Sequence, residues 1–393
     1  MDVSELTKNI TALAASGQPL PEKERVKLYS AITQLRDAIE SPLEATFRFA
    51  FGAHDAAALA IGINMELFDI SVTTGHALTV DDFAEKASAD ALLVGRVLNM
   101  LTGLGLFRPE ATEKYIATPL GSVYATGSPL RDCIIHLQSH NAATAKLPEY
   151  FRLKGYENPD DAYESPWQFS EKTDKHYFDW LAEYPHLQDA FNTALGLARL
   201  EPFHWSEFYP IKEKLQGTSN ETLLVDIGGG IGHDVIAFRE KNPDITGKLI
   251  FEDLPMVVES SKRKELPQGI EGVGHDFFQP QPDAVKGAKF YYLRTVLHDF
   301  PDKQARVIIK HVRDIMTEGS VLLINEKLMP ERDVSLLQAR LDWNMMVCFS
   351  SLDRTERQFK ELLESEGFRT TGTYRPQGDI PGSPTLLEFV LAK

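Results

Sequence analysis

The order of hydrophobic and polar positions divides the chain into two halves, with a change of pattern near residue 210. In the first half, apolar residues recur at the spacing of amphipathic helices. Examples are Phe47, Phe51, Ala58, Ile61 and Leu67. From Glu221 onward, short apolar runs alternate with amphipathic stretches, and this alternation predicts a parallel sheet with helices on both faces.

Within the first half, residues 79–118 predict two helices followed by two short strands. Thr79 and Asp82 have the spacing of a capping box at a helix start. Asp90 is an expected N-cap for the helix of residues 91–102, which Gly103 would end. The two strands are expected at residues 104–108 and 114–118. Helix, turn, helix and a two-stranded wing are the pattern of a winged helix.

Charge argues against DNA binding by this winged helix. The second helix offers only Arg96, beside Asn99, where a DNA-reading helix presents several cations. The whole chain carries a net charge of −16, which repels a phosphate backbone. We therefore expect a packing or dimerisation module and no nucleic-acid partner.

The second half predicts an α/β sheet domain. Strands are expected at residues 222–227, 249–252, 290–293 and 321–325, and helices at 303–316 and 335–347. Two further strands, at residues 370–374 and 386–392, have no helix between them and are expected to pair antiparallel at one edge. The expected division is an N-terminal helical domain (1–125), a helical connecting segment lining the substrate pocket (126–215) and a cofactor-binding catalytic domain (216–393).

Composition narrows the class of protein further. Cys133 and Cys348 are the two cysteines, too few for a disulfide scaffold or a cysteine zinc site. The first residues lack the basic start and apolar run of a signal peptide, and residues 91–107 are too short and interrupted to cross a bilayer. We expect a cytoplasmic protein without a membrane partner.

A glycine-rich turn follows the strand of residues 222–227. Gly228, Gly230 and Gly232 allow the backbone to approach a ligand, and the helix that follows supplies free N–H groups. A dinucleotide fingerprint would need another glycine at His233, and the lysine of an ATP-type loop is missing. Asp226 precedes the turn and would repel a pyrophosphate, although it suits a cationic ligand.

Acidic residues also follow the next two strands. Asp253 stands where the hydroxyls of a ribose would lie, and Asp276 follows a further candidate strand that precedes the one at residues 290–293. With Asp226, these residues place three acids around the glycine turn. The arrangement predicts a site for a nucleoside that carries positive charge, although a plain strand-to-helix turn without a ligand is the alternative.

A candidate general base follows the strand of residues 290–293. His298 stands just beyond this strand, and histidine can take a proton from a hydroxyl at neutral pH. Glu326 ends the neighbouring strand and Glu356 starts a helix, so either carboxylate could hold the imidazole. The alternative is structural: His298 could cap the helix near Asp302, and Glu356 could be an acid favoured by the helix dipole.

Five segments in this order resemble the plant-type and fungal S-adenosylmethionine-dependent O-methyltransferases, of which the caffeic acid O-methyltransferases are the type case. The segments are VDIGGGIG (225–232), FEDLP (251–255), HDFF (275–278), LHDFPD (297–302) and DRTE (353–356). The resemblance covers the whole chain and implies S-adenosylmethionine as cofactor, a Rossmann-like sheet and an N-terminal winged-helix homodimerisation domain. It assigns the catalytic roles to His298, Glu326 and Glu356, and cofactor contacts to Gly228, Asp253, Leu254, Asp276, Phe277 and Arg294.

Apolar and aromatic residues near these motifs are candidates for a pocket that takes a flat small-molecule acceptor. The candidate substrate residues are His136, Phe191, Leu195, Asp299, Trp343, Met345, Met346 and Phe349. Ordinary core packing is the alternative for many of them, and ordinary helix positions for His136 and His140. No spacing of hard oxygen ligands is evident, so no metal is expected.

Two enzyme functions remain open. The leading one is O-methylation of a hydroxyl on a small aromatic, enolic or polyketide-type metabolite. Some fungal proteins similar to these methyltransferases instead bind the cofactor and catalyse cyclisation or pericyclic rearrangement. In those relatives a permanently cationic residue typically replaces the base, so His298 with Glu326 and Glu356 favours methylation.

Overall fold

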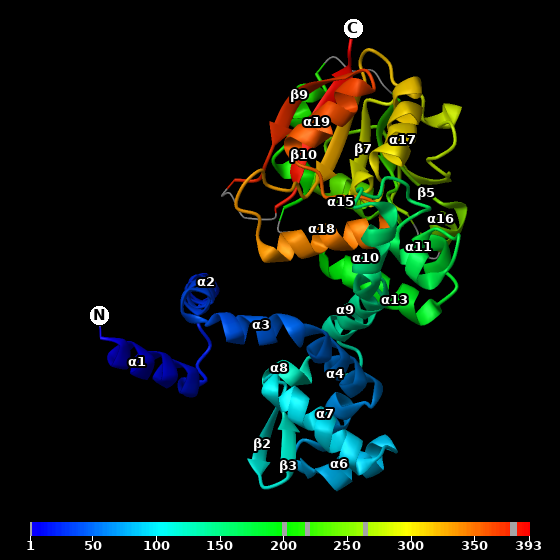
Figure 1. Cartoon of the computed structure of the whole chain (residues 1–393). Coiled ribbons are helices and arrows are strands. Elements are labelled where there is room, and N and C mark those ends of the chain that lie inside the picture. The colour runs from blue at the N-terminus through cyan, green and yellow to red at the C-terminus, as the bar shows by residue number, and fades with distance from the viewer. Residues whose placement is uncertain (1, 199–202, 217–220, 262–265, 378–382) are drawn as a thin grey trace. The chain divides into compact units, whose positions relative to one another are not determined.

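The computed structural model describes residues 2–198, 203–216, 221–261, 266–377 and 383–393 (Figure 1). The chain forms two compact units, Met1–Ala125 and Thr126–Lys393. Residues 126–215, expected as a connecting segment, belong to the second unit.

The first unit begins with helices that leave their apolar side chains uncovered. Its first five helices are α1 (Val3–Ser16), α2 (Glu22–Ile39), α3 (Pro42–Ala50), α4 (Gly52–Asn64) and α5 (Leu67–Thr74). None of the described residues of α1, α2 or α3 is buried, and Phe47 and Phe51 are about half exposed. Ala58 and Leu67, by contrast, are buried in the core of this unit. The N-terminal helices therefore carry an apolar surface that this unit does not cover.

The winged-helix part follows the predicted order. It comprises β1 (Leu78–Thr79), α6 (Val80–Ala87), α7 (Ala91–Gly103), β2 (Phe107–Ala111), β3 (Lys114–Ala117) and α8 (Pro119–Ser122), and the strands form a sheet in the order β1-β3-β2. The capping box is confirmed, because the Thr79 hydroxyl accepts from the Asp82 N–H and the Asp82 carboxylate accepts from the Thr79 N–H. The Asp90 side chain likewise accepts from the Leu93 N–H at 3.0 Å.

The strand expected from residue 104 begins instead at Phe107. Gly105 has a φ of +74°, and the Leu106 N–H donates to the Leu101 carbonyl at 2.8 Å. Residues 104–106 therefore form the turn that ends α7, because a left-handed residue after a helix satisfies its last carbonyls. The apolar residues at positions 104 and 106 alternate with a glycine as they would in a strand, although they belong to the end of the helix.

A seven-stranded sheet organises the second unit. Its strands are β4 (Thr222–Ile227), β5 (Lys248–Asp253), β6 (Ile270–Gly274), β7 (Phe290–Arg294), β8 (Val321–Glu326), β9 (Phe368–Tyr374) and β10 (Thr385–Leu391), in the order β6-β5-β4-β7-β8-β10-β9. The first five strands are parallel, and β10 runs antiparallel to both β8 and β9. The predicted parallel sheet with an antiparallel edge is confirmed.

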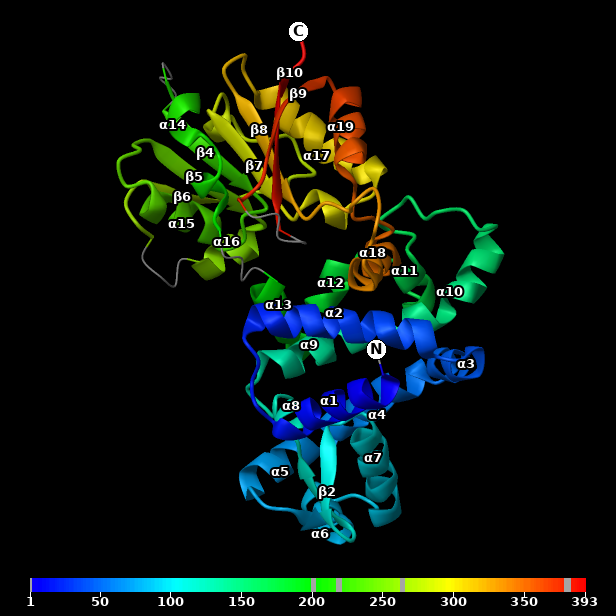
Figure 2. The same ribbon diagram turned by 90° about the vertical axis from the view of Figure 1, so that its left-hand side faces the viewer.

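Helices cover both faces of this sheet because its strands are apolar on both sides. Val225 and Ile227 pack in the core that includes α17 (Asp302–Ile315) and α19 (Glu356–Ser365). Leu224 packs in the opposite core with α15 (His233–Lys241) and α16 (Pro255–Ser261) (Figure 2). The carboxyl ends of the five parallel strands meet at one edge, where ligands bind in open α/β sheets.

The remaining longer helices of the second unit form a smaller cluster with its own core. They are α9 (Pro129–Gln138), α10 (Asn141–Lys154), α11 (Pro166–Glu171), α12 (Tyr177–Leu181), α13 (Pro185–Ala198) and α18 (Leu336–Phe349). Their buried residues include Trp167, Tyr177 and Phe349. Among the described helices no single one has the length and hydropathy to span a membrane, and one bent pair, α4 with α5, passes that test of length and composition.

Candidate active site

The glycine turn after β4 brings its backbone close to neighbouring side chains and leaves one open position. Gly228, Gly230 and Gly232 all have positive φ, at 72°, 62° and 86°. A Cβ at Gly228 would lie 2.8 Å from Val296, and one at Gly232 would lie 2.8 Å from Phe251. A Cβ at Gly230 would meet nothing within 4 Å. Gly230 therefore marks the place where the turn has room for a ligand.

One of the predicted carboxylates, Asp253, contacts this turn directly. Asp253, at the end of β5, accepts from the Gly230 N–H at 2.8 Å through one oxygen and from the Leu254 N–H at 2.8 Å through the other. Asp226 is buried near the end of β4, while the Leu254 side chain is exposed. Asp276, after β6, accepts from the Phe278 N–H at 2.9 Å.

Of two further predicted cofactor residues, Phe277 borders the same turn and Arg294 bonds the helix that follows it. A Cβ at Gly228 would lie 3.6 Å from the Phe277 ring, so Phe277 forms an apolar wall beside the turn. Arg294 ends β7, and its Nη1 donates to Asp234 Oδ1 at 2.7 Å. The positive charge of Arg294 is thus balanced by an acid in the first turn of α15. Backbone space, acids and an aromatic wall together fit a nucleoside with a positive charge.

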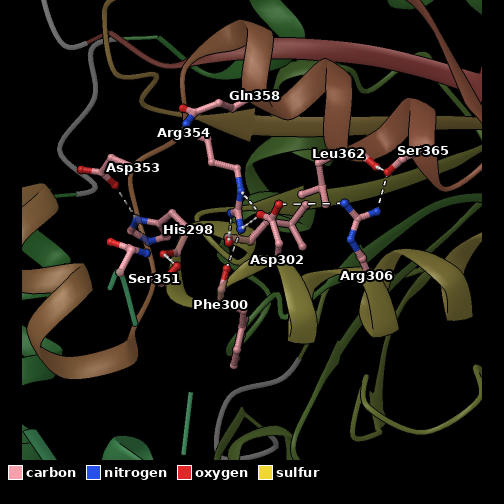
Figure 3. Close-up of polar contacts among 12 residues, drawn as sticks. His298, Phe300, Asp302, Arg306, Ser351, Asp353, Arg354, Gln358, Leu362 and Ser365 are labelled. Carbon is pink, nitrogen blue, oxygen red and sulfur yellow. Dashed lines mark hydrogen bonds and ion pairs between the residues drawn. The ribbon is translucent and has the colours of Figure 1, made fainter. Parts of the chain in front are cut away.

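His298 lies in the short turn Leu297–Asp299 that follows β7, at the carboxyl edge of the sheet. Its Nδ1 is 3.3 Å from Asp353 Oδ1 (Figure 3), and its Nε2 is 3.4 Å from Asp299 Oδ1. Burial lowers the pKa of His298, but Asp299, Glu326 and Asp353 outweigh burial and raise it to about 10. These carboxylates therefore favour the positively charged imidazole at neutral pH.

Glu326 interacts with this imidazole through the electrostatic attraction between their charges. It ends β8 with a buried side chain, and its Oε1 has no hydrogen-bond partner within the described part of the chain. Burial raises the pKa of Glu326 to about 7, although the charge of His298 opposes this shift. Because this pKa lies near neutral pH, the Glu326 carboxyl can take up or release a proton there.

Glu356 does not take the position expected from the sequence. Its carboxylate accepts from Lys360 Nζ at 2.6 Å, Arg375 Nη2 at 2.6 Å and Thr373 Oγ1 at 2.9 Å. Burial would raise the pKa of Glu356, but these hydrogen bonds lower it to about 2. The start of α19 directs this side chain toward β9 and its end, so Asp353, three residues earlier, holds the imidazole instead. The acid that holds the imidazole thus lies in the segment DRTE (353–356) that also contains Glu356, but it is the first residue of this segment and not the last.

Most of the apolar residues predicted to line an acceptor pocket gather in one aromatic cluster. Phe349 is buried there, and Phe191, Met345 and Met346 pack against it. Leu195 is half-buried in the same α13 that carries Phe191. Trp343, by contrast, is 54% exposed, and the structure does not bring it into this core.

Two histidines belong to this aromatic region. The rings of His136 and His140 meet edge to face with centroids 4.8 Å apart, and His136 also meets the ring of Phe191. His140 Nε2 is 2.8 Å from the Tyr177 hydroxyl. Burial lowers the pKa of His136 to about 4 and that of His140 to about 3, so both are neutral. Across the described ranges, no group of histidine, cysteine and acidic side chains could hold a metal ion.

Comparison with known proteins agrees with this geometry. Residues 212–369 match the model of an O-methyltransferase domain, and residues 47–127 match that of an O-methyltransferase dimerisation domain. The chain is 29% identical to methyltransferase cfoC of Aspergillus candidus, over 98% of each protein. It is 31% identical to O-methyltransferase penC of Penicillium thymicola, over 88% of this chain and 85% of that protein.

Solved structures share the fold along nearly the whole chain. LepI in complex with S-adenosylmethionine is 27% identical with a TM-score of 0.81, covering 99% of this chain and 98% of that one. A structure described as a pericyclic reaction enzyme has the same identity and TM-score and covers 99% of each chain. OxaC in complex with sinefungin and meleagrin has a TM-score of 0.83 at 22% identity, with 99% and 98% coverage, and shows the fold alone.

The sheet, the glycine turn with its acids and these similarities define a methyltransferase that uses S-adenosylmethionine. The chain belongs to the plant and fungal O-methyltransferase family. By their contact and the open space at Gly230, Gly230 and Asp253 are the residues that would hold the cofactor, which would supply an electrophilic methyl group on a positively charged sulfur.

Proposed function

We propose that the protein methylates a hydroxyl group of a small aromatic, enolic or polyketide-type metabolite, with His298 as the general base. The observation that carries this proposal is the position of His298, at the carboxyl edge of β7 with Asp353 at its Nδ1. A hydroxyl is a poor nucleophile until it loses its proton. Nε2 is the ring nitrogen that would take this proton, once the acceptor replaces Asp299 beside it.

The charge of the site sets the pH at which this base works. Only neutral imidazole accepts a proton, and a pKa of about 10 for His298 means that the neutral form is the minor one at pH 7. A phenol also has a pKa of about 10, so proton transfer between the two groups is nearly balanced in free energy. Methyl transfer is thus expected to rise with pH well above neutrality.

The same charge supports a second candidate function. A histidine held as a cation resembles a permanently cationic residue, which can polarise a substrate without removing a proton. A similar protein of known structure is described as a pericyclic reaction enzyme. The second candidate is therefore a rearrangement of a bound substrate, with S-adenosylmethionine bound but not consumed.

Mass spectrometry separates these functions. The protein would be incubated with methyl-labelled S-adenosylmethionine and a panel of phenols and hydroxypyridones. Methylation gives a product heavier by the labelled methyl group and an equal amount of demethylated cofactor. A product of unchanged mass, formed equally well with the demethylated cofactor, would refute methylation and support rearrangement.

Cofactor binding depends on the open position at Gly230. A tryptophan there would fill the space beside Asp253 and would be strained at a φ of +62°. We expect Gly230→Trp to abolish binding of S-adenosylmethionine in calorimetry while the circular dichroism spectrum stays that of the folded protein. Binding with unchanged affinity would place the cofactor elsewhere.

A homodimer formed through the first unit completes the proposal. Supporting it are the match to a dimerisation domain and the exposed apolar side chains of α3, among them Phe47. Light scattering is expected to give about twice the 44.1 kDa mass of one chain. Phe47→Glu should shift the equilibrium toward monomer, and a monomeric wild-type protein at micromolar concentration would contradict the proposal.

A further inference from the structure

Tyr163 is a half-exposed aromatic residue on the segment of residues 155–165, which links α10 to α11. Its side chain remains 51% exposed, although the neighbouring Ala162 is fully buried. Loops that a rigid scaffold positions often carry binding residues. The surroundings of Tyr163 therefore indicate what its exposed ring could bind.

The backbone around Tyr163 is tied to two helices. The Asp161 carboxylate accepts from the Tyr163 N–H at 3.0 Å, and it also accepts from the side chains of Lys303 and Gln304 in the first turn of α17. The Ala162 carbonyl accepts from a side-chain amide on α11 at 3.0 Å. Because the segment is held in this way, little further ordering is needed when a ligand covers the ring.

A row of aromatic rings connects Tyr163 to the glycine turn. The ring centroid of Tyr163 is 5.5 Å from that of His176, and His176 stacks on Phe300 at 6.0 Å. Phe300 meets Phe277 edge to face at 5.7 Å, and Phe277 is the apolar wall beside Gly228. One end of the row thus borders the cofactor turn, and Tyr163 stands exposed at the other end.

Acidic side chains lie near the Tyr163 hydroxyl. Partial burial raises the pKa of this hydroxyl, and the charges of Asp179, Asp276 and Asp161 raise it further. The hydroxyl is therefore neutral at neutral pH. Asp276 is one of the acids predicted to hold the cofactor, and its effect on Tyr163 shows that the two residues lie within electrostatic range of each other.

We propose that Tyr163 is a further cofactor-binding residue, whose ring stacks on the nucleobase of S-adenosylmethionine and closes the site on the side of Asp276. Every nucleobase offers a flat face on which an aromatic ring can stack. The inference goes beyond the proposed function and holds for methylation and rearrangement alike, because both reactions need the bound cofactor. The competing account is that Tyr163 contacts the acceptor.

Calorimetry with S-adenosylmethionine tests this assignment. Tyr163→Ala should raise the Kd by about 10–100-fold, the usual loss when a ring that stacks on a base is removed. Tyr163→Phe keeps the ring and should bind like the wild type. Because the side chain is half exposed, its removal should leave the circular dichroism spectrum unchanged. The matched control is Tyr156→Ala, on the same segment and at a 79% exposed position, which should keep the wild-type Kd.

S-adenosylhomocysteine decides which part of the cofactor the ring meets. This compound keeps the nucleoside but lacks the methyl group and its positive charge, so Tyr163→Ala should lose affinity for it by the same factor. A wild-type Kd in Tyr163→Ala would overturn the assignment, as would a loss confined to S-adenosylmethionine or a Tyr163→Phe variant as weak as Tyr163→Ala. An unchanged Kd with a raised KM for the acceptor would support the competing account. Failure of the proposed methylation would instead appear in the mass of the product and not in these Kd values.

Discussion

Histidines occupy two opposite environments in the second unit. His298 stands among Asp299, Glu326 and Asp353, which raise its pKa to about 10. His136 and His140 stand among aromatic rings, where burial lowers their pKa to about 4 and about 3. At neutral pH one region holds a cation and the other holds two neutral rings, although the residue type is the same.

This difference assigns different tasks to the two regions. A charged imidazole surrounded by acids can exchange a proton, and its charge responds to pH in the alkaline range. A neutral imidazole in an apolar region can only donate or accept a hydrogen bond. The Nε2 of His140 forms a hydrogen bond with the Tyr177 hydroxyl. The Nδ1 atoms of His140 and His136 have no partner within the described residues. The neutral pair is therefore suited to binding a polar group on an otherwise apolar acceptor.

The largest effect is expected at His298. If it is the base, His298→Ala should lower kcat by about 10²–10⁴-fold, the usual contribution of general base catalysis. Binding of S-adenosylmethionine should hardly change, because Gly230 and Asp253 remain in place. In the wild type, kcat should rise with pH with a midpoint near pH 10, and the variant should lack the rise that comes from His298.

The pH dependence of stability checks the same charge independently of turnover. His298 has a folded-state pKa above its ordinary value of 6.5, so its ion pairs stabilise the fold fully below pH 6.5. This contribution is lost as the pH rises through about 10. Denaturant unfolding of wild type and His298→Ala should therefore differ most at low pH and converge above pH 10. A constant difference would mean that the imidazole is not held as a cation.

A smaller effect is expected at His136. His136→Ala should raise KM for the acceptor by about 10-fold, the equivalent of one hydrogen bond of about 1.4 kcal/mol, with little change in kcat. The pH profile of kcat should keep its shape, because a group with a pKa of about 4 stays neutral throughout. His311→Ala on α17 is the control and should leave KM unchanged. A His136 variant that loses kcat and alters the pH profile would erase the distinction between the two regions.

Much of the fold could be predicted from sequence because the central strands are apolar on both faces. The expected strand of residues 222–227 has the bounds of β4, and those of β7 and β8 differ by one residue. Because parallel strands end at one edge of a sheet, these strand bounds also predicted that His298, just after β7, lies at the carboxyl edge. The resemblance, rather than periodicity, supplied the choice of cofactor.

Sequence could not predict which acid holds the imidazole. Asp353 and Glu356 are three residues apart, and the choice depends on where α19 begins and which way its first side chain points. Long-range partners such as Arg375 decide that direction, and they are fixed only by the packing of β9. His140 was named from the sequence, but its partner was not, because an isolated histidine in a helical pattern does not reveal that Tyr177 will meet it.

The smallest effect on turnover is expected at Glu356, which belongs to neither histidine region. Glu356→Gln should leave kcat and its pH profile unchanged, because its carboxylate bonds Lys360, Thr373 and Arg375. Its folded-state pKa of about 2 lies below the ordinary value of 4.5, so it stabilises the fold above pH 4.5. Charged hydrogen bonds contribute about 1.5–3 kcal/mol, so Tm at pH 7 should fall by several degrees. The difference from wild type should shrink as the pH falls from 4.5 toward 2. A large loss of kcat with unchanged Tm would instead return Glu356 to the catalytic role that its sequence position suggested.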